Sequence, residues 1–309
     1  MEAAAGKNPT GSSALQLWLA YPSDLVEPAI EEACAALLDD AERARAARFR
    51  FARHRREYLA THALARVALS HVHPLPPHAW SFSVNQYGKP SPIPECGLRF
   101  NQSNSMELAV CLIARSIARP AACPVAGIAA NPGTADAKAG PAAGVEIGVD
   151  VESFARAEQI VPLASRVFSA AERAQLDALP AAERPDRALS LWTLKEAYIK
   201  ARGMGLSLPL QGISFLFDGP QAMRFEVEPG VDDEPRRWRF CRFDHAGHRI
   251  ALAVDANAAP SPEIAPEIAA TGNLEIFEVR PPLGPPTRLA LGSPAWFPIS
   301  ANSGSVREA

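Results

Sequence analysis

Apolar positions along the chain follow two periods, which predict a mixture of strands and helices. Residues 14–22, ALQLWLAYP, form an apolar run typical of an opening strand. Residues 55–71 instead carry apolar side chains 3.6 residues apart, which predicts a helix. After a proline-rich turn, short strands are expected around SFSV, GLRFN and ELAVCLIA. The first half of the chain therefore predicts one helix and several strands.

The same kinds of element return after a break in the pattern. Residues 118–143 are small, rich in Pro and Gly and aperiodic, which predicts a flexible linker or surface insertion. Beyond it we expect a strand at VEIGVDVE, a helical stretch near 156–177, a helix at LWTLKEAYIKAR and strands at ISFLF, RFEVE, RWRFCRF and RIALAV. The sequence predicts an α+β fold with an N-terminal half at 14–117 and a C-terminal half at 144–256.

The last part of the chain, residues 257–309, differs in composition from both halves. It begins APSPEIAPEIAA and is rich in Pro and Ala, although LEIFEVR and PTRLAL suggest a strand pair. The proline content predicts a loosely attached tail.

Composition narrows the class of protein. A chain of 309 residues, 48% hydrophobic and 21% charged, can bury a large core. No run approaches the roughly 18 apolar residues of a membrane span, and the first residues lack the apolar core of a signal peptide. We therefore expect a cytoplasmic protein without membrane attachment. Five cysteines without a CxxC pair indicate neither a disulfide framework nor a thiolate zinc site.

Positive charge gathers in one stretch although the net charge of −3 argues against bulk nucleic-acid binding. Within this stretch, Glu57 is the main negative charge that opposes the arginines. A basic patch of this kind suits the binding of phosphates or of an acidic partner. A solvent-exposed helix face without a binding role would show the same cluster of arginines. The arginines are Arg43, Arg45, Arg48, Arg50, Arg53, Arg55, Arg56 and Arg66.

The stretch VEIGVDVE, read as a strand, places carboxylates on one face. Asp150 and Glu152 then point to the side opposite the valines and Ile147, beside Gly148, which leaves room for a ligand. Two hard oxygen donors converging on one volume suit Mg²⁺. An edge strand with a solvated polar face has the same pattern, so both interpretations stay open here.

The helix at 191–202 carries two of the chain's five lysines. Trp192, Glu196 and Lys200 lie along one face, apart from an apolar stripe. An ordinary exposed pair between Glu196 and Lys200 explains this pattern as well as a site does. The stripe consists of Leu191, Leu194, Tyr198 and Ala201.

Together, GVDVE and WTLKEAYIKARGMGLSLPL resemble the two signatures of the 4'-phosphopantetheinyl transferases of the long, single-chain, surfactin type. Those signatures are a G-[VI]-D-[VIL]-E strand and a W-[STA]-x-K-E-[SA]-[YF]-x-K helix. YGKP at 87–90 is similar to the family's GKP loop, and residues 55–66 are similar to its basic first helix. The resemblance covers roughly residues 14–255.

This resemblance implies a fold and an activity. The fold would be a pseudo-dimer of two similar α+β halves, with coenzyme A and Mg²⁺ between them. The activity would be transfer of phosphopantetheine from coenzyme A to a serine of an acyl or peptidyl carrier protein, releasing adenosine 3',5'-bisphosphate. Because both halves belong to one chain, we expect a monomer.

The resemblance also assigns roles to residues. Asp150, Glu152 and Glu196 match the family's metal-holding acids, and Glu196 is in addition the candidate base for the serine proton. Lys200 would neutralise the pyrophosphate or the leaving group. Lys195 would anchor its helix or contact phosphate less directly. The positions expected to bind coenzyme A, or in the case of Arg48 and Arg53 to face an acidic carrier, are Arg48, Arg53, Arg56, Lys89, Ser103 and Asn104.

One stretch departs from the family pattern. The family reads F-N-[LIV]-S-H-[ST], whereas residues 100–105 read FNQSNS. Asn104 cannot carry the charge of the usual histidine, so we expect a weaker phosphate contact there. Gln102 replaces an aliphatic residue and is expected to disturb packing. These changes motivate one alternative, a non-catalytic module that binds coenzyme A or a carrier protein. Another is a Mg²⁺-dependent nucleotide or pyrophosphate hydrolase, which would leave the WTLKEAYIK helix unexplained.

Overall fold

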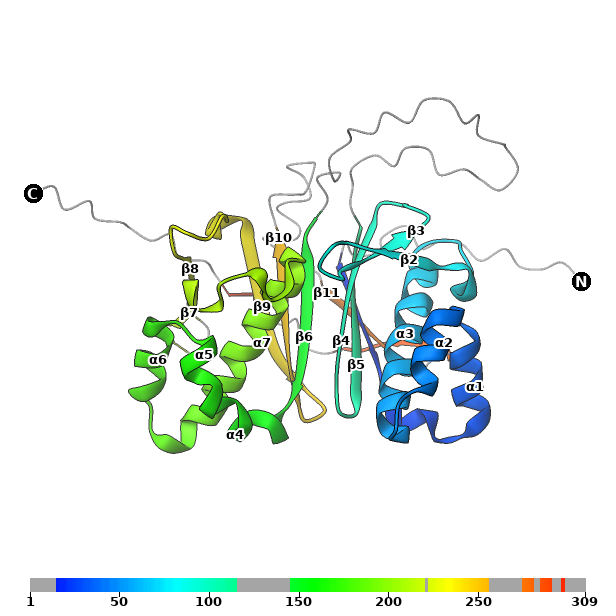
Figure 1. Ribbon diagram of the computed structural model, residues 1–309, viewed down its shortest axis with the longest axis horizontal. Helices are drawn as coiled ribbons and strands as arrows, with labels where there is room; N and C mark the ends of the chain where they lie inside the picture. The colour runs from blue at the N-terminus through cyan, green and yellow to red at the C-terminus, as the bar shows by residue number, and fades with distance from the viewer. Residues whose placement is uncertain are drawn as a thin grey trace, which may run out of the picture.

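Helices and antiparallel strands occur in both halves of the chain, which confirms the α+β prediction (Figure 1). The structure is a computed structural model that describes residues 15–115, 145–219, 222–255, 274–280, 284–290 and 296–297. The expected linker at 118–143 lies outside the described residues. Within them, no helix is both long and apolar enough to cross a membrane.

Three α-helices and five strands form the main elements of the described N-terminal part. The helices are α1 (Pro28–Ala36), α2 (Asp40–Ala47) and α3 (Ala52–Val72). The strands are β1 (Leu15–Ala20), β2 (Ser81–Val84), β3 (Pro90–Ile93), β4 (Leu98–Ser105) and β5 (Leu108–Arg115). Helix α3 is the one that the apolar spacing predicts.

The C-terminal part contains a second long helix and further strands. Its helices are α4 (Ala157–Ile160), α5 (Ala164–Val167), α6 (Ala170–Asp177) and α7 (Arg184–Arg202). Its strands are β6 (Ile147–Ser153), β7 (Ile213–Phe217), β8 (Met223–Val227), β9 (Trp238–His245), β10 (His248–Asp255), β11 (Leu274–Val279), β12 (Pro286–Arg288) and β13 (Trp296–Phe297). The helical stretch expected near 156–177 is interrupted, because Ser169 caps a new helix there with Glu172.

Two sheets pack face to face between the long helices; the second is antiparallel, and the first is antiparallel except for one parallel pair of strands, β1 and β11. One sheet has the strand order β12-β11-β1-β5-β4, and the other has the order β13-β9-β10-β6. Helix α3 covers the outer face of the first sheet and α7 that of the second, so the layers run helix, sheet, sheet, helix (Figure 1). Each half thus has a long helix on a sheet, but a pseudo-dimer of related halves stays a prediction.

Strand β1 is buried on both faces because it separates two cores. Trp18 and Ala20 pack toward α3, whereas Leu17 and Leu19 pack against the second sheet. A continuous apolar run such as LQLWLA is what a strand in this position requires.

The prediction of a loosely attached tail is wrong for the tail residues that the structure describes. Strand β11 pairs in parallel with β1, and β13 pairs with β9 in the other sheet. Ile276 and Val279 are buried. Backbone pairing and apolar burial hold these segments whatever the proline content between them, and the suggested strand pair is present as β11 and β12.

Gly148 lets α7 approach β6 closely. A Cβ atom on this residue would lie 2.0 Å from the carbonyl oxygen of Ala197 and 2.5 Å from the amide nitrogen of Ala201. The space beside the carboxylates that we assigned to a ligand is therefore filled by helix backbone. Backbone atoms cannot move aside as a flexible side chain can.

We expect Gly148→Ala to destabilise the protein, because α7 must shift to accommodate one methyl group. Overpacking of this kind typically lowers the free energy of unfolding by about 1–3 kcal/mol. Urea denaturation followed by circular dichroism measures the change. Gly230→Ala is the matched control, since nothing lies within 4 Å of its added Cβ. Equal effects of the two substitutions would contradict the packing role of Gly148.

Candidate active site at the junction of the two halves

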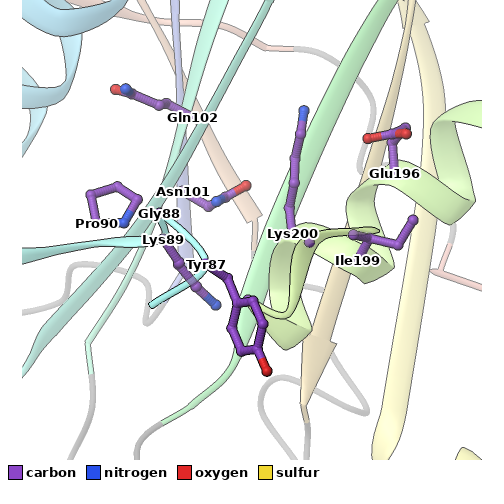
Figure 2. A pocket seen from close by; sticks show the side chains of 11 residues that line it. Tyr87, Gly88, Lys89, Pro90, Asn101, Gln102, Glu196, Ile199 and Lys200 are labelled. Atoms are coloured by element: carbon purple, nitrogen blue, oxygen red, sulfur yellow. The ribbon is translucent and has the colours of Figure 1, made fainter. Parts of the chain in front are cut away.

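A cleft of about 260 Å³ lies where β4 and the loop before β3 face α7. Figure 2 shows Lys200, Glu196 and Asn101 around it, with Tyr87 and Lys89 from the loop. The cleft therefore draws its walls from both halves. Its lining consists of Tyr87, Gly88, Lys89, Pro90, Asn101, Gln102, Glu196, Ile199, Lys200, Gly203 and Gly205.

The side chain of Asp150 in β6 bonds one residue of β4 and one residue of α7. Its Oδ1 atom accepts hydrogen bonds from Ser103 Oγ of β4 at 2.9 Å and from Lys200 Nζ of α7 at 2.6 Å. Lys200 also donates to Ser103 Oγ at 2.8 Å. The second carboxylate oxygen, Oδ2, is buried without a partner in the described structure. An unpaired buried anionic oxygen is costly unless a cation approaches it.

Glu152 lies two residues further along β6. Its Oε2 atom accepts a hydrogen bond from Ser105 Oγ at 2.9 Å. Its Oε1 atom accepts one from Trp192 Nε1 at 3.2 Å and pairs with Arg156. Only 4% of Asp150 and 6% of Glu152 are exposed, so the solvated-edge interpretation of this strand is wrong.

Glu196 of α7 faces the same region and is only partly exposed. Burial raises the pKa of its carboxyl group, as do the neighbouring Asp150 and Glu152, while Lys200 opposes the shift. Among the described residues it makes no hydrogen bond or ion pair with the protein. A carboxylate with a raised pKa and free lone pairs is suited to accept a proton.

Lys89 joins the loop before β3 to the other half. Its ammonium donates to the carbonyl of Ala201 at the end of α7 and lies 3.4 Å from the carbonyl oxygen of Ile147. Burial lowers the pKa of Lys89 to about 8; Glu146 opposes this and Arg99 adds to it. Lys89 lines the cleft, but its ammonium is directed to backbone carbonyls, so binding of the coenzyme A phosphates by Lys89 stays a prediction.

The arginines expected to bind coenzyme A do not line this cleft. Arg48 and Arg53 are exposed and Arg56 is half-buried. Other arginines of the stretch have structural partners, such as buried Arg66, which pairs with Glu42. Binding of phosphate or an acidic carrier by Arg48, Arg53 and Arg56 stays a prediction.

The two residues that depart from the family pattern lie differently. Asn104 is exposed and is not part of the cleft lining. Gln102 contributes to the lining, yet Figure 2 shows its side chain pointing away from Lys200, whereas that of Asn101 points toward it. The Oε1 atom of Gln102 is buried and unpaired within the described structure.

Lys195 anchors its helix rather than facing the cleft. It is 1% exposed and forms an ion pair with fully buried Glu172 at 2.8 Å. Its ammonium also donates to the carbonyls of Leu210 and Ile213. Of the two roles we expected for Lys195, the structure favours anchoring, because the ammonium is enclosed by protein acceptors.

The acidic residues do not form a ready-made metal cage. In the described ranges, no group of three or more His, Cys, Asp or Glu side chains is placed to hold a metal ion. The donors nevertheless fit Mg²⁺, since this ion typically uses one or two carboxylates together with substrate phosphates and water. The Oδ2 atom of Asp150, which is buried and has no hydrogen-bond partner among the described residues, is the clearest oxygen donor for such an ion.

Sequence reasoning assigned no role to three residues that hold the site together. Ser105 and Trp192 donate to Glu152, and Asn101 accepts from the Val149 amide at 2.9 Å. Period-two alternation in FNQSNS places Asn101, Ser103 and Ser105 on one strand face, and that signal could have grouped them. Nothing in the sequence says which strand they face.

Comparisons with known proteins identify relatives of this chain. Residues 146–253 match the model of the 4'-phosphopantetheinyl transferase superfamily. The transferase HetI of Nostoc sp. is 30% identical over 221 residues, which are 71% of this chain and 80% of that protein. A 4'-phosphopantetheinyl transferase of Bacillus subtilis is 30% identical over 193 residues, 62% of this chain and 70% of that protein.

Among solved structures, a holo-(acyl-carrier-protein) synthase from Bacillus anthracis in complex with CoA (3',5'-ADP) covers 35% of this chain and 93% of its own. Its sequence identity is 18% and its TM-score is 0.30. The extent of the match to HetI, together with the match to the superfamily model, shows that this chain belongs to the 4'-phosphopantetheinyl transferase superfamily.

Proposed function

We propose that this chain transfers the 4'-phosphopantetheine group from coenzyme A to a serine of an acyl or peptidyl carrier protein. The observation that carries the proposal is that Glu196 and Lys200 line one inter-half cleft, where Lys200 pairs with buried Asp150, in a member of this superfamily. Opposite charges so arranged suit a reaction that builds negative charge on phosphoryl oxygens.

In the proposed reaction, the carrier serine oxygen attacks the β-phosphorus of the coenzyme A pyrophosphate. A new phosphodiester bond forms, and the bond from that phosphorus to the bridging oxygen breaks. Adenosine 3',5'-bisphosphate leaves. The serine proton passes to Glu196, whose raised pKa favours proton uptake. Lys200, beside Asp150, supplies positive charge to the pyrophosphate and the leaving group.

The same carboxylates would hold a magnesium ion. Asp150 and Glu152, with Glu196, are the residues that would bind it, and the unpaired Oδ2 atom of Asp150 supports this assignment. A bound Mg²⁺ would offset charge on the pyrophosphate. If Glu196 binds the ion, it would accept the serine proton less directly.

The architecture also bears on assembly and location. Both walls of the cleft come from one polypeptide, so we propose that the enzyme works as a monomer, which light scattering can test. A cytoplasmic location agrees with the availability of coenzyme A and carrier proteins as substrates. Arg48 and Arg53 are exposed and Arg56 is half-buried, and we propose that they meet either the coenzyme A phosphates or an acidic carrier.

Intact-mass spectrometry of an apo carrier protein tests the proposed activity. The carrier is incubated with the enzyme, coenzyme A and Mg²⁺, and a parallel sample contains EDTA. We expect the carrier to gain the mass of one phosphopantetheine group only when the metal is available.

Two other results would favour different functions. No mass gain with several carriers, while coenzyme A still binds in calorimetry, would indicate a non-catalytic binding module, which the departures at Gln102 and Asn104 suggest. Release of inorganic phosphate from nucleotides without a carrier would indicate a hydrolase.

A further inference from the structure

Alternate residues of β4 form a polar seam with β6. Asn101 accepts from the Val149 amide, Ser103 donates to Asp150, and Ser105 donates to Glu152, each at 2.9 Å. Strands β4 and β6 belong to different sheets and different halves. The N-terminal half therefore contacts the acidic strand through this row of short polar side chains.

Ser105 is held on several sides by the C-terminal half. Its carbonyl oxygen lies 3.0 Å from His248 Nε2. Its hydroxyl oxygen accepts a hydrogen bond from the Ser153 amide at 3.1 Å. Because that N–H group points at the oxygen, the hydroxyl proton is directed to Glu152 Oε2. Ser105 is 6% exposed, so water has little access to replace this bond.

The contact with Ser105 decides how the Glu152 carboxylate is oriented. The Trp192 indole and the Arg156 guanidinium both act on Oε1, whereas Ser105 is the donor to Oε2. The terminal torsion of a glutamate is broad, so donors on one oxygen alone leave its plane loosely defined. Donors on both oxygens fix it.

We propose that Ser105 is a positioning residue that orients Glu152 for metal binding, an inference that rests on the proposed function. Ser105 itself need not touch the metal or the substrate. Groups that hydrogen-bond a metal-binding carboxylate typically change metal affinity by about 10–100-fold when they are removed. Ser103 is a less selective probe, because it also bonds Lys200.

The test measures metal affinity instead of turnover. Mg²⁺ is titrated by calorimetry into the full-length enzyme saturated with coenzyme A, without a carrier protein, so that no transfer occurs. We expect Ser105→Ala to weaken Mg²⁺ binding by about 10–100-fold. Ser105→Thr keeps the hydroxyl group that Ser105→Ala lacks, so this variant should retain most of the wild-type affinity for Mg²⁺.

A matched control separates positioning from general loss of packing. Ser70→Ala removes another serine oxygen of the N-terminal half, one that accepts from the Trp80 indole at 2.9 Å away from the cleft. This variant should bind Mg²⁺ as the wild type does. If Ser105→Ala does not fold in a thermal melt, Ser105→Cys replaces it, since a thiol is a weak donor and should weaken binding too.

Each result has a defined meaning. Wild-type affinity in Ser105→Ala, or equal weakening in Ser105→Ala and Ser70→Ala, would overturn the positioning role. Failure of Ser105→Thr to restore affinity would also count against it. A wild-type enzyme that binds no Mg²⁺ in the presence of coenzyme A would instead remove the metal from the proposed function and the role of Ser105 with it.

Discussion

Replacement of Glu196 by glutamine is expected to abolish transfer and leave the fold at least as stable as the wild type. Glutamine keeps the volume but cannot accept the serine proton, and loss of a general base typically lowers the rate by about 10²–10⁴-fold. Among the described residues, Glu196 makes no hydrogen bond or ion pair that the substitution would break. Burial and the nearby Asp150 raise its pKa, which means that the folded protein disfavours its charge.

The measurements are initial rates of carrier modification by mass spectrometry and thermal unfolding of the same preparations. Glu183→Gln is the matched control, because it makes the same chemical change on an exposed residue at the start of α7. It should retain the wild-type rate. A Glu196→Gln enzyme with a near wild-type rate would remove Glu196 from the mechanism.

Replacement of Lys195 by methionine should strongly destabilise the protein. The substitution leaves Glu172 buried without its ion-pair partner and leaves the carbonyls of Leu210 and Ile213 without their donor. Burial already raises the pKa of Glu172 and lowers that of Lys195, so each charge depends on the other. Removing one partner of a buried pair costs about 3–5 kcal/mol.

A double-mutant cycle identifies the cause of that loss. Lys195→Met, Glu172→Gln and the double variant are compared by chemical denaturation. We expect the double variant to lose less stability than the sum of the single variants, because it contains no unpaired buried charge. Additive losses, or a loss below about 1 kcal/mol in Lys195→Met, would show that the pair does not anchor α7.

Periodicity in the sequence predicted local faces correctly where burial alone determines them. The valines of β6 pack into the core between the sheets, and the apolar stripe of α7, with Leu194 and Tyr198, packs into the core of the second half. A period of two or 3.6 residues records which side of an element is apolar. It therefore sufficed to place Asp150 and Glu152 together on one side of their strand.

Contacts between elements could not be read in the same way. Lys195 looked available for phosphate because its partner Glu172 belongs to a different helix. The space beside Gly148 was assigned to a ligand because the sequence of the strand does not show that α7 packs against this residue. Ser105 is adjacent to Glu152 only because β4 packs against β6 of the other sheet, which is a property of the folded chain.

Strand β11 has a consequence for how the protein is made. It pairs with β1, the first strand that the structure describes, although β11 ends only at Val279. One edge of β1 therefore stays unpaired while the C-terminal half is synthesised. An exposed strand edge invites pairing with other chains during that interval. Truncation after residue 256, where composition alone suggests a boundary, would make this exposure permanent.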